Sequence, residues 1–277
     1  MAEKQSSKED ILNFSDEKVG SSVIDAETMR KLLAIFDSAR KSVCKVKPVH
    51  KDQGTGAFYE VVDGNDIDRF IFMTCNHVLP TNSLNEISQA IFEFEDIQQL
   101  RSFSFDKTDV KYIWTTKIYD VTIIEISIDV ANLYKHYGVK FLKVGQLTAG
   151  NEVAILQYPK GKFGIAHGDI DHINGNDVFY QIGTAPGSSG SPLLNWDCKA
   201  LAMHKAGEQL NGFDGRPELW RKASALTAIV EAYLEDQAND RLQCAFNNYT
   251  EHTVTIFTTT STKIPKWILN VKKYWDR

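Results

Sequence analysis

Residues 183–194 read Gly-Thr-Ala-Pro-Gly-Ser-Ser-Gly-Ser-Pro-Leu-Leu, a run with three glycines, two prolines and a pair of adjacent serines. The run follows residues 178–182, whose alternating apolar pattern predicts a β-strand that ends in a tight loop. Glycines let the backbone bend so that a serine hydroxyl projects outward while nearby N–H groups turn inward to stabilise an oxyanion. The loop therefore indicates Ser189 as a nucleophile, with the N–H groups of Gly187 and Ser189 as the oxyanion hole.

Two other stretches carry the partners that a nucleophilic serine needs. Residues 70–79, Phe-Ile-Phe-Met-Thr-Cys-Asn-His-Val-Leu, form a hydrophobic strand that leads to His77. Asp120 stands directly before Val-Thr-Ile-Ile-Glu-Ile, the pattern of a buried strand. A histidine can act as the general base and an aspartate can orient it. Asp106 and Asp109 are the competing carboxylates, but each lies nearer a lysine and looks like part of a solvated loop, so Asp120 is favoured.

The sequence resembles the chymotrypsin-like (trypsin-like) serine peptidases, most closely the glutamyl-endopeptidase branch and intracellular trypsin-like peptidase domains. Five blocks match in the family's order, over about residues 42–236: residues 54–58, 74–78, 119–123, 186–193 and 202–207. The resemblance implies a hydrolase, a serine endopeptidase with the triad His77, Asp120 and Ser189. It also implies an all-β fold of two packed antiparallel six-stranded β-barrels with an N-terminal and a C-terminal helix, and the triad in the cleft between the barrels.

The same resemblance suggests which residues line the pocket for the P1 side chain, the one just before the cleaved bond. Thr184 and His204 match the positions at which glutamyl endopeptidases hold an acidic side chain, and Gly207 follows in the same block as His204. A protonatable imidazole and a hydroxyl can pair with a carboxylate. Gly183 occupies the position where trypsin carries an aspartate, which disfavours cleavage after Lys or Arg. Acidic and apolar P1 residues both remain open.

Composition narrows the function class. The chain has 277 residues, 43% of them hydrophobic, which is enough for a two-lobed domain with a large core. Its net charge of −5 gives no general reason to expect nucleic-acid binding. There is no long apolar run, so no membrane contact is expected, and the polar N-terminus lacks a secretory signal pattern. We therefore expect a cytoplasmic or otherwise intracellular protein whose substrate is a polypeptide.

No cofactor or metal is expected from the sequence. The cysteines are scattered without the spacing of metal ligands, although four could form two disulfides: Cys44, Cys75, Cys198 and Cys244. Residues 167–177 hold two histidines and several aspartates, but they lack the terminal glutamate of a calcium loop. The Asn-Gly pair at 174–175 instead predicts a hairpin that joins strands 163–173 and 178–182.

The chain divides into three expected parts. Residues 1–41 form a polar tail and an amphipathic helix over 25–40, whose apolar face is Met29, Leu32, Leu33, Phe36 and Ala39. Residues 42–236 form the peptidase domain, with an N-terminal barrel over about 42–128, a C-terminal barrel over about 139–236, and a helix over 223–234 capped by Ser224. Residues 237–277 are a C-terminal tail of unknown role. The N-terminal helix or this tail could bind a regulatory partner.

A second function class stays open. A peptidase-like module that has lost its activity could use its cleft or sheet edges to hold extended peptides in a larger signalling or defence assembly. A hydrolase of the nucleophile-elbow type fits less well, because in that fold the histidine is the last triad member along the chain, whereas here it is the first.

Overall fold

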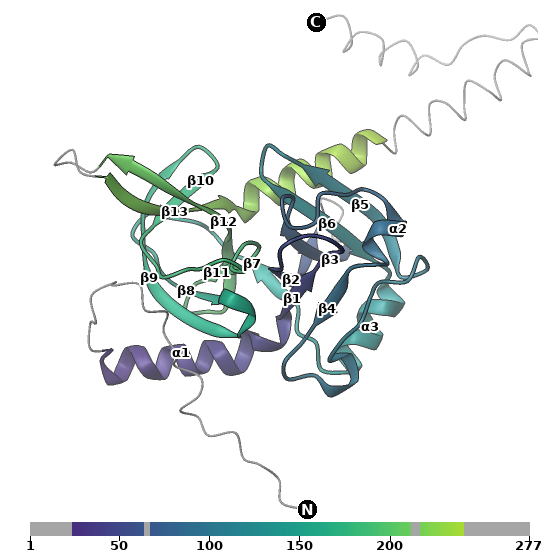
Figure 1. Cartoon of the computed structure of the whole chain (residues 1–277), viewed down its shortest axis with the longest axis horizontal. Coiled ribbons are helices and arrows are strands. Elements are labelled where there is room, and N and C mark those ends of the chain that lie inside the picture. Colours follow the sequence, from purple (N-terminus) through teal and green to yellow (C-terminus); the bar gives the residue numbers. More distant parts are fainter. Residues whose placement is uncertain (1–23, 64–66, 212–216, 241–277) are drawn as a thin grey trace, which may run out of the picture. The chain divides into compact units, whose positions relative to one another are not determined.

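The computed structural model describes residues 24–63, 67–211 and 217–240 (Figure 1). The chain divides into two units, Met1–Glu231 and Ala232–Arg277. The first contains every strand discussed below. Of the second, only residues 232–240 are described, and they are helical. Cys244, like most of the expected tail over 237–277, lies outside the described residues.

The first lobe is an antiparallel sheet of six strands in the order β4-β1-β2-β3-β6-β5. Their bounds are β1 (Val43–Lys47), β2 (Gly54–Val62), β3 (Asp68–Cys75), β4 (Ile91–Glu93), β5 (Val110–Thr116) and β6 (Val121–Ile126). Among the described residues no pairing joins β4 to β5. β4 has only three residues, and the sheet continues past it through a single bridge between Phe92 and Phe103. The interior is aromatic, with Phe58 packed on Phe72 and Phe94.

The second lobe is a closed barrel of six antiparallel strands. The order is β11-β8-β9-β10-β13-β12, and the pairing of β12 with β11 closes it. The bounds are β8 (Glu152–Gln157), β9 (Gly164–Asn174), β10 (Asp177–Tyr180), β11 (Pro192–Leu194), β12 (Lys199–Asn211) and β13 (Pro217–Ala225). The predicted hairpin across residues 174–177 is confirmed, with Gly175 at φ 59° in its turn. The all-β, chymotrypsin-like fold class is therefore confirmed.

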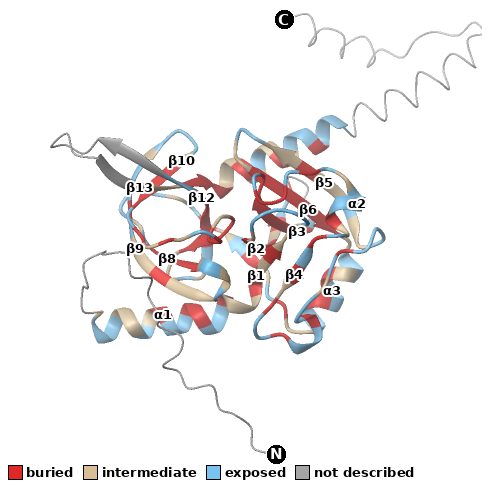
Figure 2. Cartoon of the chain, in the orientation of Figure 1, coloured by how far each residue is buried: buried red, intermediate tan, exposed pale blue. Residues whose placement is uncertain are grey.

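One strand joins the two lobes in a way that the sequence did not predict. β7 (Leu142–Val144) pairs in parallel with β2 of the first lobe and with β12 of the second. The strands of both lobes therefore belong to one continuous sheet, with β7 as a parallel link between the two antiparallel lobes. Figure 2 shows that the buried residues follow the strands of both lobes.

The helices are short apart from the two near the ends of the described chain. They are α1 (Ala26–Ala39), η2 (Arg40–Ser42), α2 (Leu84–Ile87), η3 (Gln98–Leu100), α3 (Ile128–His136), η4 (Pro159–Gly161) and a helix over residues 226–240. Asp25 caps α1, since its Oδ1 accepts hydrogen bonds from the N–H groups of Glu27 and Thr28 at 2.8 and 2.9 Å. No helix among the described residues is long and apolar enough to cross a bilayer.

Two details of the helix predictions were wrong. In α1, Leu33 is 43% exposed and Ile35 is buried, because the face that packs consists of residues 32, 35, 36 and 39. Ser224 caps no helix. It lies in β13, where it is paired with Asp177 of β10 and Met203 of β12. Pairing on both sides holds this segment extended, so the following helix begins only at residue 226.

Candidate active site

His77 and Asp120 are brought together by the pairing of two strands. His77 follows the end of β3 and Asp120 precedes the start of β6, and the antiparallel register places Cys75 opposite Val121. His77 Nδ1 lies 2.6 Å from Asp120 Oδ2, and the His77 N–H donates to Asp120 Oδ1 at 2.9 Å. The N–H of Asn76 donates to the Asp120 carbonyl at 3.0 Å. The aspartate thus fixes both the ring and the main chain of His77, whose side chain is half exposed.

The Ser189 segment is anchored beside these residues through shared backbone partners. The carbonyl of His204 accepts hydrogen bonds from the N–H of Gly190 at 2.8 Å and from the Cys75 thiol at 3.2 Å. The His204 carbonyl therefore links Gly190, which follows Ser189, to Cys75, which lies two positions before His77. On the other side, the Thr55 N–H donates to the Ser189 carbonyl at 2.8 Å. A Cβ added to Gly54 would lie 3.1 Å from that carbonyl oxygen and 2.6 Å from Val78.

Hydrogen bonds to two carbonyls of the Ser189 loop fix the directions of the Gly187 and Ser189 N–H groups. The carbonyl of Pro186 accepts from the Lys160 N–H at 2.7 Å, and the carbonyl of Ser188 accepts from the Ser191 N–H at 3.0 Å. In a trans peptide the N–H points opposite to the carbonyl. The N–H groups of Gly187 and Ser189 therefore point away from these contacts, as expected of oxyanion donors.

Gly187 needs to be a glycine. Its φ is +100°, and an added Cβ would lie 2.5 Å from the Tyr158 carbonyl oxygen. Its own carbonyl accepts a hydrogen bond from Thr55 Oγ1 at 2.7 Å, and the same hydroxyl accepts from the Tyr158 N–H at 3.0 Å. Thr55 is thus a support of the loop that sequence reasoning missed. The sequence did carry a signal for this role, because Thr55 stands between Gly54 and Gly56. Glycines have no side chain beyond the backbone, so other chain segments can approach Thr55 closely.

The three residues predicted to line the P1 pocket all lie near Arg221 of β13. His204 is buried, and its Nδ1 lies 2.6 Å from the hydroxyl of the buried Tyr180. Burial, together with the nearby charges of Arg221 and His77, lowers the pKa of His204 from 6.5 to about 3. The imidazole is therefore neutral at pH 7. The Thr184 carbonyl accepts from Arg221 Nη2 at 3.4 Å, and Gly207 lies opposite Arg221 across β12 and β13.

Cys75, His77 and Asp120 offer possible metal-ligand atoms within 4.8 Å of one another. A metal-bound cysteine must be a thiolate. Burial raises the pKa of the Cys75 thiol well above its usual value, and that thiol donates to the His204 carbonyl. His77 Nδ1 is already engaged by Asp120. This donor set favours a hydrogen-bonded catalytic group over a metal centre. Cys44, Cys75 and Cys198 are all free thiols.

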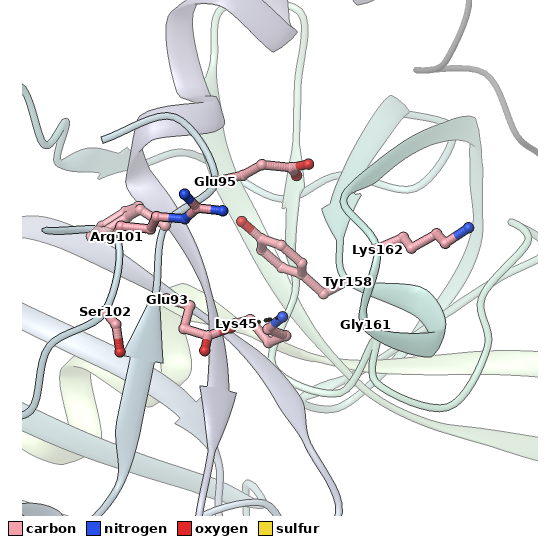
Figure 3. A pocket seen from close by; sticks show the side chains of 9 residues that line it. Lys45, Glu93, Glu95, Arg101, Ser102, Tyr158, Gly161 and Lys162 are labelled. Atoms are coloured by element: carbon pink, nitrogen blue, oxygen red, sulfur yellow. Dashed lines mark ion pairs between the residues drawn. The ribbon is translucent and has the colours of Figure 1, made fainter. Parts of the chain in front are cut away.

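A separate cavity of about 450 Å³ lies elsewhere in the chain (Figure 3). None of the predicted site residues lines it. Its walls are Lys45, Glu93, Phe94, Glu95, Arg101, Ser102, Tyr158, Gly161 and Lys162. Tyr158 and Gly161 belong to the same segment as Lys160, whose N–H donates to the Pro186 carbonyl, so this cavity borders the segment that contacts the Ser189 loop.

Comparisons with known proteins agree with this geometry. Residues 54–203 match the family model described as a trypsin-like peptidase domain. Comparison with curated protein sequences gives no match. Among solved structures, the inactive form of a serine-to-alanine mutant of Rv3671c from M. tuberculosis is similar, with 15% identity, a TM-score of 0.53, and coverage of 78% of this chain and 96% of that one. A Glu endopeptidase in complex with MPD has 18% identity, a TM-score of 0.50, and coverage of 73% and 93%.

At these identities the solved structures support the fold alone, and the family rests on the family model, which spans more than half of the chain. The matched span includes the residues around His77, Asp120 and Ser189, together with β2, β3, β6 and the Gly187 loop. The chain therefore belongs to the trypsin-like peptidase family and is a serine endopeptidase.

Proposed function

We propose that this endopeptidase cleaves peptide bonds with His77, Asp120 and Ser189 as its triad, and with the N–H groups of Gly187 and Ser189 as its oxyanion hole. The observation that carries the proposal is the double hydrogen bond of Asp120 to the ring and the main chain of His77. It lies beside a glycine-rich loop whose carbonyls are fixed by Lys160 and Ser191. We assign this activity to residues 42–236.

In the proposed reaction, Ser189 Oγ attacks the carbonyl carbon of the substrate while His77 Nε2 takes the hydroxyl proton. Asp120 holds Nδ1–H and stabilises the imidazolium that forms. The oxyanion accepts hydrogen bonds from the two loop N–H groups. When the tetrahedral intermediate collapses, the C–N bond breaks and His77 gives its proton to the leaving amine. Water then attacks the acyl-enzyme by the same route and releases the carboxylic acid and the free serine.

We further propose that the enzyme prefers an acidic P1 residue, held in a pocket lined by Thr184, His204 and Gly207. The supporting observations are that Arg221 hydrogen-bonds to the Thr184 carbonyl and is paired with Gly207, and that it lies within electrostatic reach of His204. A pocket with a cation in its wall favours a carboxylate over an apolar side chain.

The triad is tested with a serine-reactive phosphonate probe and a peptide cleavage assay. Ser189→Ala should lose labelling, and its turnover should fall on the order of 10⁶-fold. The matched control is Ser191→Ala. Ser191 is buried two positions along the same loop, and its hydroxyl has no hydrogen-bond partner among the described residues, so its loss should leave labelling and cleavage near normal. Labelling that persists in Ser189→Ala would contradict the assignment. A folded wild-type protein that is not labelled would favour the inactive peptide-binding module.

A further inference from the structure

We propose that Arg221, on the inward face of β13, is the residue that binds the carboxylate of an acidic P1 side chain. This inference rests on the proposed function and names the cation that its pocket uses. The sequence did not single out Arg221, which lies beyond the family-model match. Only the pairing of β13 with β10 and β12 shows that Arg221 lies near the predicted pocket residues.

The strand register places Arg221 on the pocket side of β13. It lies directly opposite Tyr180 on β10 and Gly207 on β12, and directly opposed residues share one face of a sheet. Ala223, two positions along β13, packs in the barrel core together with Tyr180. Lys222, between them, faces the other way, where its Nζ lies 2.9 Å from Asp177 Oδ2. The half-buried Arg221 therefore lies over the end of the barrel interior.

Open space lies next to the residue that Arg221 contacts. Arg221 Nη2 donates to the Thr184 carbonyl at 3.4 Å, so the guanidinium lies against the segment that leads into the catalytic loop. A Cβ added to Gly183, the residue before Thr184, would meet no atom within 4 Å. The Gly183 carbonyl is held from the other side by Gln157 Nε2 at 2.9 Å. Gly183 therefore has open space beside it, and the next residue, Thr184, contacts the Arg221 guanidinium.

Arg221 is better suited than His204 to bind a carboxylate. His204 is buried and its ring is hydrogen-bonded to Tyr180, which leaves a neutral imidazole in the pocket wall. A guanidinium keeps its charge at all relevant pH values and can make two parallel hydrogen bonds to one carboxylate. In this pocket His204 and Tyr180 form the wall, and Arg221 supplies the charge.

The test compares peptides that differ only in Glu or Gln at P1, because these side chains have the same shape. The wild type should cleave the Glu peptide with the higher kcat/KM. Arg221→Gln should reduce the Glu-to-Gln ratio about 10- to 100-fold, the usual effect of losing a hydrogen bond to a charged group. Lys222→Gln is the matched control, since it removes the neighbouring positive charge on the opposite face and should leave the ratio unchanged.

A second pair of variants gives an answer even if Arg221→Gln fails to fold. Gly183→Asp places a carboxylate in the open space one residue before the Arg221 contact and should abolish the preference for Glu. Gly183→Asn adds the same volume without charge and should keep it. Phosphonate labelling of Ser189 is measured in every variant. A labelled wild type that prefers Gln, Phe or Leu, or an unchanged ratio in labelled Arg221→Gln or Gly183→Asp, overturns the role of Arg221. Absent labelling of the wild type would instead refute the triad.

Discussion

Asp120 holds His77 at two points, because one carboxylate oxygen accepts from the main-chain N–H and the other lies 2.6 Å from the ring Nδ1. The aspartate itself has φ 53°, an unusual value for a residue other than glycine. Its backbone is held there by the turn between β5 and β6, where its N–H donates to the Lys117 carbonyl. The orientation of the His77 ring therefore depends on a turn of the neighbouring strand pair, outside the segment that carries His77.

Replacing this carboxylate should damage catalysis far more than stability. Asp120→Asn keeps the size of the side chain, and asparagine tolerates a positive φ, but the amide favours the wrong tautomer of His77. We expect kcat to fall about 10⁴-fold while the unfolding midpoint changes little. Steady-state kinetics and denaturant unfolding measure the two effects.

The chain provides a matched control for that variant. Asp171 Oδ2 lies 2.8 Å from the Nδ1 of His172, an exposed pair with the same hydrogen bond on β9. Asp171→Asn should leave kcat unchanged. If Asp120→Asn retained near-normal turnover, His77 would not depend on this carboxylate and the triad assignment would be wrong.

Thr55 should matter for catalysis although it does not touch the substrate. Thr55→Val keeps the shape of the side chain but removes the hydroxyl that holds the Gly187 carbonyl and accepts from the Tyr158 N–H. Both backbone groups then lose a buried partner, which costs about 1–3 kcal/mol each. The freed loop should also lower kcat, by up to about 10²-fold, as expected when one oxyanion donor is displaced.

The kinetic effect of Thr55→Val must be separated from its effect on stability. Ser104→Ala removes a hydroxyl that donates to the carbonyl of the buried Ala90 at 2.7 Å, far from the catalytic loop along the chain. It should lower stability without changing kcat. A Thr55→Val protein with reduced stability but full kcat would show that the hydroxyl supports only the fold.

The buried His204 should make the protein less stable in mild acid. Its pKa is lowered by burial, and by the charges of Arg221 and His77, from 6.5 to about 3. Between these two values the unfolded chain binds a proton that the folded chain does not, so stability falls as the pH falls. From pH 7.5 to pH 5 this one group should cost about 2 kcal/mol.

Denaturant unfolding at pH 7.5 and pH 5 measures that loss. In His204→Gln the loss should be about 2 kcal/mol smaller than in the wild type, because no imidazole is left to titrate. His136 is exposed at the end of α3, so His136→Gln should behave like the wild type. An equal loss in the wild type and in His204→Gln would mean that this imidazole does not resist protonation.

Much of the fold was predictable because strands and turns leave local patterns. β3 is the predicted hydrophobic strand that leads to His77, and the Asn-Gly turn joins β9 to β10 as expected. The predictions were wrong where a distant partner outweighed the local pattern. Ser224 looked like a helix cap, but pairing with β10 and β12 keeps it in a strand. Ile35 and not Leu33 is buried in α1, because the rest of the fold decides which face of that helix packs.

By itself, the sequence determined the family, the kinds of side chain available for catalysis, and the glycine-rich loop that can present a serine. It could do so because a strand period, a glycine cluster and the order of His, Asp and Ser are all properties of neighbouring residues or of their order. Only the tertiary structure decided that Thr55 supports Gly187, 132 residues away, and that Arg221 lies opposite Tyr180 and Gly207. Those contacts depend on strand register and barrel closure, which no local stretch of the chain specifies.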